Sequence, residues 1–161
     1  METIPFADFA QATPKISLQK KELFPYVDIA AITPGHRYVK ALQERSYKGG
    51  GSKFQTGDTL FARITPCLEN GKIAQFIGPA SDTVGFGSTE FFVFRARDGV
   101  SDPSYLFYLC RTDALRKPAE KSMAGASGRQ RADLNSILSV EVCRPPLPTQ
   151  RKIASILSAY D

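Results

Sequence analysis

The chain has 161 residues, of which 42% are hydrophobic and 23% are charged, and its formal net charge is +5. This length suits one domain with its own core, and this composition excludes a disordered chain. The sequence contains no Cys-x-x-Cys metal motif, no apolar run near the roughly 18 residues of a membrane span, and no signal-peptide pattern at its start. We therefore expect a cytoplasmic domain whose three cysteines stay reduced.

Strand-like runs occupy the first two thirds of the chain. The first, residues 24–32, is rich in β-forming side chains and ends at a Thr-Pro-Gly turn. Residues 59–64 and 72–77 flank a connection with an Asn-Gly turn, which predicts a hairpin. Residues 90–96 contain consecutive aromatic side chains, so we expect this strand to be covered on both faces.

Helical periodicity replaces the strand pattern after residue 101. Asp102 and Pro103 have the N-cap and first-position signature of a helix. Its apolar face is expected from Tyr105, Leu106, Tyr108 and Leu109. A second helix is expected over residues 113–123, broken at Pro118. A short helix or turn and a last strand should follow.

The sequence ends on a further amphipathic helix pattern. Thr149 stands where an N-cap belongs and Pro148 disfavours an earlier start, so this helix is expected over residues 150–161. Its apolar face combines Ile153, Ile156, Leu157 and Tyr160. The predicted fold class is therefore α+β: a twisted, mostly antiparallel sheet with helices packed on it, ending in the start of a protruding C-terminal helix.

Basic residues cluster in two windows, residues 36–53 and 116–131, which together hold ten of the 21 lysines and arginines. Both windows contain glycine and serine, so part of the charge lies on loops that can approach a phosphate backbone closely. An ordinary solvated surface explains such windows equally well. The triple glycine at residues 49–51 lacks the Gly-Lys-Ser/Thr of a phosphate-binding P-loop, and a mobile loop tip is expected there.

The sequence argues against catalysis. Residues 102–105, Asp-Pro-Ser-Tyr, are similar to the Asp-Pro-Pro-Tyr tetrad of adenine methyltransferases, but no glycine-rich cofactor loop precedes them, and helix capping accounts for them. No acidic residue has a lysine two positions later, as the metal site of restriction nucleases requires. The single histidine, His36, lies in a loop without an evident partner for a catalytic triad.

Four segments carry a family resemblance: GDTLFARITPCLENGKIA, GSTEFFVFRA, GASGRQR and PPLPTQRKIASIL. In this order and spacing they resemble the target recognition domain of a type I restriction-modification specificity subunit, from about residue 24 to the end. The last segment is the most specific of the four. The family usually has an acidic residue where Thr149 stands, and threonine can cap a helix as well.

The resemblance implies a non-catalytic subunit that reads one half of a bipartite double-stranded DNA target. Methyl transfer with S-adenosylmethionine and cleavage with ATP and Mg²⁺ are then expected in partner methyltransferase and restriction subunits, so this chain needs no cofactor or metal of its own. In the family, a long spacer helix follows each recognition domain, pairs with its counterpart beside a second recognition domain and docks the methyltransferase subunits.

The same resemblance divides the chain into a recognition domain, residues 1–145, and the truncated start of the spacer helix, residues 146–161. The apolar face of that helix would then pair with the helix of a second recognition domain or with a second copy of itself. The residues expected at this partner interface are Ile153, Ile156, Leu157 and Tyr160.

Candidate DNA contacts follow from the basic windows. Reading a sequence requires hydrogen-bonding side chains at base edges, held in place by contacts to phosphates. For the phosphates we expect Lys48, Lys53, Lys117 and Lys121. Arginine reads guanine and glutamine reads adenine. For base edges we expect Arg45, Arg129, Gln130 and Arg131.

Residues beside the hairpin are assigned to the surface or to structure. Arg63 and Lys72 flank the hairpin and are expected to be surface residues, and residues 88–90 are expected to hold a loop against the sheet. Two other functions stay open: a non-specific or architectural DNA-binding domain, and a protein-interaction module without DNA readout. A base preference that persists at raised salt would separate specific readout from both.

Overall fold

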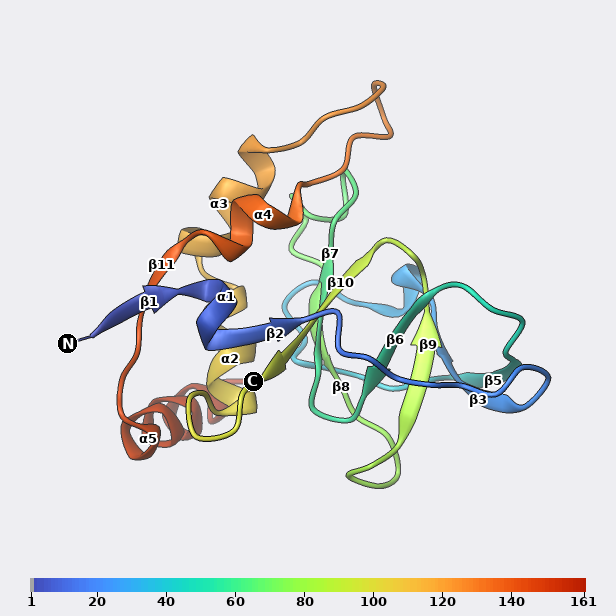
Figure 1. Cartoon of the computed structure of the whole chain (residues 1–161), viewed down its shortest axis with the longest axis horizontal. Helices are drawn as coiled ribbons and strands as arrows, with labels where there is room; N and C mark the ends of the chain where they lie inside the picture. The colour runs from blue at the N-terminus through green and yellow to red at the C-terminus, as the bar shows by residue number, and fades with distance from the viewer. Residues whose placement is uncertain (1) are drawn as a thin grey trace.

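The computed structural model of the chain describes residues 2–161, and its strands form three sheets (Figure 1). A five-stranded sheet runs in the order β2 (Ala10–Ala12), β10 (Phe91–Ala96), β7 (Thr59–Ala62), β8 (Ile73–Phe76) and β4 (Tyr38–Val39). A four-stranded sheet runs in the order β5 (Gln43–Ser46), β3 (Leu23–Val27), β9 (Val84–Gly87) and β6 (Ser52–Gln55). A two-stranded sheet pairs β1 (Thr3–Pro5) with β11 (Glu141–Cys143). Among the strand pairs of residues 2–161, only β3–β9 and β4–β8 are parallel, so the predicted mostly antiparallel pairing is confirmed.

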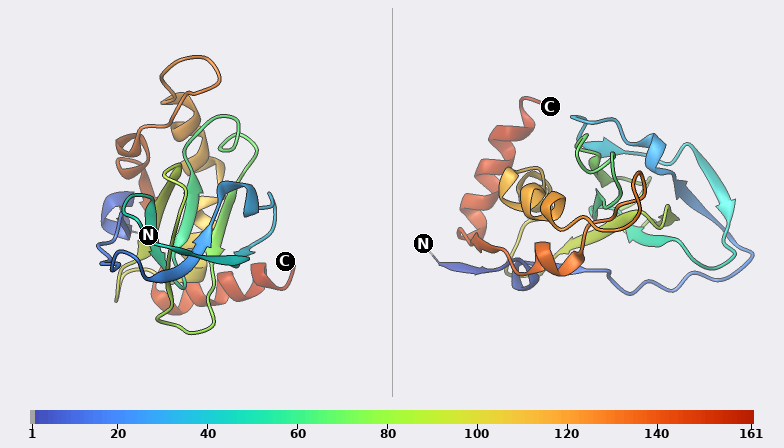
Figure 2. Two further views of the ribbon diagram at one scale, coloured as in Figure 1. Left: turned by 90° about the vertical axis from the view of Figure 1, so that its right-hand side faces the viewer. Right: turned by 90° about the horizontal axis from the view of Figure 1, so that it is seen from above.

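The helices gather on one side of the molecule and the four-stranded sheet lies on the other (Figures 1 and 2). The helices are α1 (Phe6–Phe9), α2 (Pro103–Cys110), α3 (Asp113–Lys121), α4 (Leu134–Leu138) and α5 (Leu147–Ser158), and a 3-10 turn spans Ile29–Ala31. The five-stranded sheet stands between the helices and the four-stranded sheet. The α+β class predicted from the sequence is confirmed.

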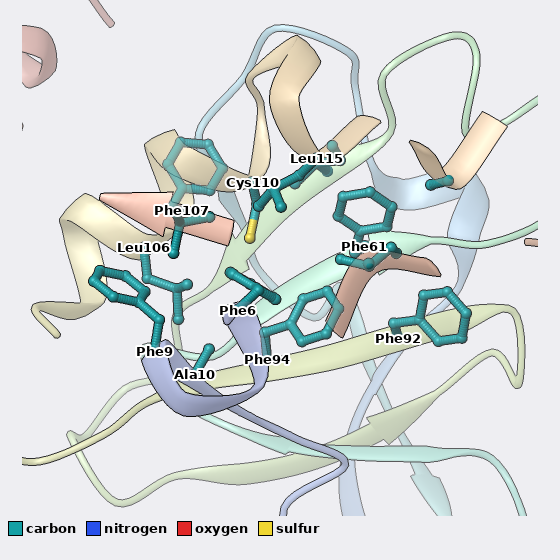
Figure 3. Close-up of a cluster of buried hydrophobic side chains, with 14 of the residues drawn as sticks. Phe6, Phe9, Ala10, Phe61, Phe92, Phe94, Leu106, Phe107, Cys110 and Leu115 are labelled. Carbon is teal, nitrogen blue, oxygen red and sulfur yellow. The ribbon is translucent and has the colours of Figure 1, made fainter. Parts of the chain in front are cut away.

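Two buried clusters share the strand β10. Phe92 and Phe94 pack into the larger cluster, where α1, α2 and α3 cover the sheet (Figure 3). Phe91 and Val93 pack into the second cluster on the opposite face. Burying such side chains contributes about 1.5–3 kcal/mol each. The consecutive aromatic residues therefore are covered on both faces, as predicted.

The parallel pair β3–β9 depends on glycine. A Cβ atom on Gly87 would lie 2.0 Å from the carbonyl oxygen of Val27, and one on Gly85 would lie 2.9 Å from that of Pro25. Only a residue without a side chain permits so close an approach of the two backbones. Glycine is uncommon in strands, so the sequence of β9 does not predict a strand.

The first predicted strand is too long. It was expected to run to residue 32, but β3 ends at Val27 and a 3-10 turn follows. The carboxylate of Asp28 accepts a hydrogen bond from the backbone N–H of Ala30 at 3.3 Å, which stabilises a turn in place of extended backbone.

The predicted break at Pro118 is also wrong. The helix α3 runs unbroken through Pro118, although the proline ring removes one backbone donor. Leu115 and Ala119 are buried in the main core on either side of the proline. Packing of this face therefore outweighs the local cost of the proline.

The C-terminal helix begins earlier than predicted. The helix α5 starts at Leu147, so Pro148 lies in its first turn and Thr149 inside the helix rather than at its N-cap. A proline in the first turn lacks an N–H that has no partner within the helix in any case. The helix lies against α2, where Gln150 and Ala154 are buried.

Candidate nucleic-acid interface

Three cations of the first basic window lie on or beside the four-stranded sheet. On β5, the guanidinium of Arg45 lies 3.9 Å from the ring centre of Tyr26. On β6, Nζ of Lys53 lies 5.4 Å from the ring centre of Tyr47, and Lys48 is exposed in the connection between these strands. Aromatic rings therefore orient Arg45 and Lys53. None of the three cations has a carboxylate partner among the described residues.

Arg37 belongs to the first window in sequence, but it does not lie on the surface. Its side chain is buried and donates hydrogen bonds to Gln75 at 3.0 Å, to Ser104 at 2.6 Å and to Tyr108 at 3.5 Å. It therefore joins β8 to α2 and adds no charge to an accessible surface.

The second basic window begins on α3. Lys117 is exposed, and its Nζ lies 3.7 Å from a carboxylate oxygen of Asp113, one turn away. Lys121 is exposed at the end of the same helix. An exposed pair at this spacing adds only about 0.3–0.5 kcal/mol, so Lys117 is easily released for another anion.

A loop at the end of this window is anchored at its base and exposed at its tip. The backbones of Ala124 and Arg131 exchange hydrogen bonds of 3.2 and 3.0 Å, and the carbonyl of Gln130 accepts a bond from the N–H of Thr65 at 2.9 Å. Between these anchors, residues 125–129 are exposed and project from the molecule (Figure 1). Arg129 therefore lies on a projecting tip, whereas Gln130 is half-buried.

Arg131 is held by the carboxylate of Glu90, the residue directly before β10. Its Nε donates to the two carboxylate oxygens of Glu90 at 3.1 and 2.9 Å, and its Nη2 donates to Oε1 at 2.8 Å. The hydrogen bond from Arg131 lowers the pKa of Glu90 below its usual value. Glu90 thus stays ionised at neutral pH and fixes the direction of the arginine, which agrees with the loop-holding role expected for residues 88–90.

A surface hollow of about 710 Å³ lies at the end of the first window. Gly51, Ser52 and Lys53 line it from the first window, and Asp133 and Leu134 line it just after the second. The lining also includes Lys15, Arg63 and two buried aromatic residues, Phe91 and Phe92. The lining contains three cations and one carboxylate, so the hollow favours an anionic ligand.

Arg63 is more than the surface residue predicted from the sequence. Its guanidinium lies 4.7 Å from the ring centre of Phe92, and Nη2 donates to the carbonyl of Ala132 at 3.4 Å. Its Nε is buried and has no hydrogen-bond partner among residues 2–161. The sequence signal was a basic residue directly after a strand, which alone does not reveal that the strand end faces a hollow.

The predicted DNA contacts therefore fall into three groups. Arg45, Lys48 and Lys53 lie with the four-stranded sheet, whereas Lys117 and Lys121 lie on the helical side (Figures 1 and 2). Arg129, Gln130 and Arg131 form the third group, at the loop of residues 124–131. The hollow adds Lys15 and Arg63 to the cations predicted from the sequence. The structure brings Lys53 into the hollow and does not bring Arg45 or Lys117 there.

Within residues 2–161, no group of three or more histidine, cysteine, aspartate or glutamate side chains could hold a metal ion. No helix in that range is long and apolar enough to cross a membrane. The tetrad at residues 102–105 is a helix start, because the carboxylate of Asp102 accepts a hydrogen bond from the N–H of Tyr105 at 3.0 Å.

Two curated specificity subunits from Escherichia coli are similar in sequence. The type I restriction enzyme EcoAI specificity subunit is 29% identical over 148 residues, which cover 89% of this chain and 25% of that protein. The EcoEI specificity subunit is 27% identical over 161 residues, which cover 98% of this chain and 27% of that protein. The chain therefore spans about a quarter of the length of these relatives.

Solved structures share the fold over nearly the whole chain. The HsdS subunit from Thermoanaerobacter tengcongensis matches with a TM-score of 0.74 and 24% identity, covering 99% of this chain and 41% of that one. A chain from a study of complex assembly and conformational transition of the type I R-M system matches with a TM-score of 0.75 and 23% identity, with the same coverage of 99% and 41%.

The family comparison agrees with the order of the four segments and with the fold. The model of the type I restriction modification DNA specificity domain matches residues 2–161. The chain belongs to the family of type I restriction-modification DNA specificity domains.

Proposed function

We propose that the chain recognises the sequence of one half of a bipartite double-stranded DNA target, as part of a type I specificity subunit. The observation that carries this proposal is the match of residues 2–161 to a DNA specificity domain, together with a cationic hollow at the end of the first basic window. Cations on loops and at a hollow suit phosphates, and the anchored loop at residues 124–131 suits a DNA groove.

Contacts to phosphates and to bases fall to different side chains in this proposal. Lys48, Lys53, Lys117 and Lys121 neutralise phosphates, and Lys15 and Arg63 extend that set across the hollow. The side chains proposed for base edges are Arg45, Arg129, Gln130 and Arg131. Phosphate contacts set the register of the protein on the duplex and carry no sequence information of their own.

The chemistry is assigned to partners. Methylation and cleavage, with S-adenosylmethionine, ATP and Mg²⁺, belong in this proposal to methyltransferase and restriction subunits in the cytoplasm, and the chain directs them to DNA without a catalytic step or a bound cofactor. This division is supported by the relatives, which are specificity subunits, and by the helix-capping role of Asp102 in the one methyltransferase-like tetrad.

Selection from randomised duplex DNA tests the proposal. The purified chain is mixed with the pool, washed at low and at moderate salt, and the retained DNA is sequenced. Sequence readout predicts a short motif of fixed spacing that survives the higher salt, because the counterion contribution falls equally for every sequence. Retention at low salt without a motif would instead support a non-specific DNA-binding domain, and no retention would support a protein-interaction module.

We also propose that residues 1–145 form the recognition domain and that residues 146–161 begin a spacer helix that pairs with another helix. On α5, the side chains of Ile156, Leu157 and Tyr160 are 54%, 40% and 86% exposed, whereas Ile153 is half-buried. Three large apolar side chains on one exposed helix face favour a protein partner. The partner proposed is the equivalent helix of a second recognition domain or of a second copy.

Charge substitutions on this face test the pairing. The double variant Ile156→Asp and Leu157→Asp should keep the melting temperature of the chain but abolish its association with a full specificity subunit or with itself in analytical ultracentrifugation. Ser155→Asp, on an exposed position outside the apolar face, is the matched control and should associate normally. Equal association of both variants would contradict the pairing.

A further inference from the structure

Glu90 occupies one edge of the Arg131 guanidinium and leaves another edge free. The bonds to Glu90 use Nε and one side of Nη2, at 2.8–3.1 Å. Nη1 makes no hydrogen bond within residues 2–161. A guanidinium has five N–H groups in a rigid plane, so the end formed by Nη1 and Nη2 still presents two parallel donors.

The backbone of Arg131 is fixed as firmly as its side chain. It forms β-bridges with Ile64 on one side and with Ala124 on the other, and the next residue, Ala132, donates to the carbonyl of Arg63 at 2.8 Å. The side chain is 45% exposed, whereas that of Glu90 is 19% exposed. Nearly half of the Arg131 side chain is therefore open to solvent, and Glu90 is the more covered partner of the pair.

Two parallel donors at a fixed place match one base in the major groove. Guanine presents the acceptors O6 and N7 side by side, whereas adenine presents one donor beside one acceptor. Thymine and cytosine do not offer two adjacent acceptors there. We propose that Arg131 reads a guanine through Nη1 and Nη2, and that Glu90 is the positioning residue that holds the guanidinium for this contact.

The ion pair also makes a phosphate the less suitable partner for Arg131. Glu90 neutralises most of the charge that would attract a phosphate, and its own charge repels one. A neutral base edge does not suffer this repulsion, and its two hydrogen bonds depend on direction rather than on net charge. Lys53, which has no carboxylate partner among the described residues, is the better phosphate ligand.

This inference rests on the proposed DNA recognition and is tested by the same selection with three variants. Arg131→Lys keeps the charge but loses the rigid fork. Glu90→Gln keeps the size but loses the charge and one acceptor. Glu141→Gln, exposed on β11 and not among the residues that line the hollow, removes the same charge and is the matched control.

The wild-type chain and Glu141→Gln should enrich the same motif, with a guanine at one fixed position. Arg131→Lys should lose the preference for that guanine by about 5- to 100-fold while other positions persist. Glu90→Gln should weaken the same position, although it strengthens non-specific binding as Glu141→Gln does. Circular dichroism of each variant confirms folding.

The outcomes separate the two proposals. A wild-type motif that stays unchanged in Arg131→Lys overturns the guanine contact and leaves the proposed DNA recognition intact. An unchanged motif in Glu90→Gln, with guanine lost in Arg131→Lys, overturns the positioning role of Glu90. A wild-type chain that enriches no motif overturns the proposed function, and this inference with it.

Discussion

Gln150 is fully buried at the start of α5, yet its side-chain amide is satisfied. Its Nε2 donates to the carbonyls of Val100 and Pro145 at 2.9 and 2.8 Å, and its Oε1 accepts from the N–H of Asp102 at 2.9 Å. One side chain therefore joins α5 to the segment that leads into α2. These hydrogen bonds link α5 to the start of α2. Ala154 is the other buried side chain of α5.

Substitution Gln150→Leu should lower the free energy of unfolding by about 2–4 kcal/mol. Leucine fits the volume but leaves the N–H of Asp102 and the carbonyls of Val100 and Pro145 without their partner, and each buried unpaired group costs about 1–3 kcal/mol. Urea denaturation measures the change. The control, Thr149→Ala at the neighbouring exposed position, should change the free energy of unfolding by less than about 0.5 kcal/mol. Equal changes in both variants would contradict the stabilising role of the Gln150 hydrogen bonds.

The Glu90–Arg131 pair should make stability depend on pH in the acid range. The hydrogen bond from Arg131 lowers the pKa of Glu90 from its usual 4.5, so the folded chain binds fewer protons than the unfolded chain just below that value. The stabilisation is complete above the unfolded pKa and is lost as the pH falls through the folded pKa. The difference in unfolding free energy between wild type and Glu90→Gln, from urea titrations, should therefore be constant near neutral pH and narrow below about pH 4.5. A difference that does not change with pH would contradict this.

At the scale of elements, α3 tolerates a proline that the sequence pattern treats as a break. Pro118→Ala should raise the free energy of unfolding by about 2 kcal/mol, because a proline inside a helix costs about 3 kcal/mol relative to alanine while restricting the unfolded chain by about 0.4–1 kcal/mol. Thermal and urea unfolding measure the gain. Pro148→Ala in the first turn of α5 is the control and should give no gain, since no helical bond is missing there.

Elements with strong local signals could be predicted from the sequence, and elements made by distant contacts could not. The hairpin of β7 and β8, the doubly covered β10 and the capped start of α2 all follow from local patterns. The strand β9 has two glycines and exists because β3 approaches it closely. Short edge strands such as β4 and β5 are likewise fixed by their partners rather than by their own residues.

The candidate site shows the same division. The two basic windows were visible in the sequence, but the pairing of Arg131 with Glu90 joins residues 41 positions apart. Arg37 belongs to the first window in sequence, but its side chain is buried and hydrogen-bonds to residues 38, 67 and 71 positions away. Composition shows how much positive charge is present, and only the fold shows which cations are free to bind.

At the scale of the molecule, the cations lie on different sides. Lys53 faces the hollow beside the four-stranded sheet, and Lys152 is exposed on α5 on the helical side. If DNA binds across the hollow, Lys53→Ala should reduce the slope of log K against log salt by about 0.9, the value for one phosphate contact. Lys152→Ala should leave the slope unchanged. Fluorescence anisotropy with a labelled duplex at several salt concentrations measures both, and equal slopes would place the DNA elsewhere.

The pairing of β1 with β11 brings the first and last strands of the fold side by side. Thr3 lies opposite Cys143, and the N–H of Arg144 donates to the carbonyl of Glu2 at 2.8 Å, so the chain enters the domain beside the place where it departs into α5 (Figure 1). A unit whose entrance and exit adjoin can be spliced into a longer polypeptide without stretching the flanking segments. Replacing the whole segment between these two strands would therefore leave the start of α5 beside the chain that precedes β1.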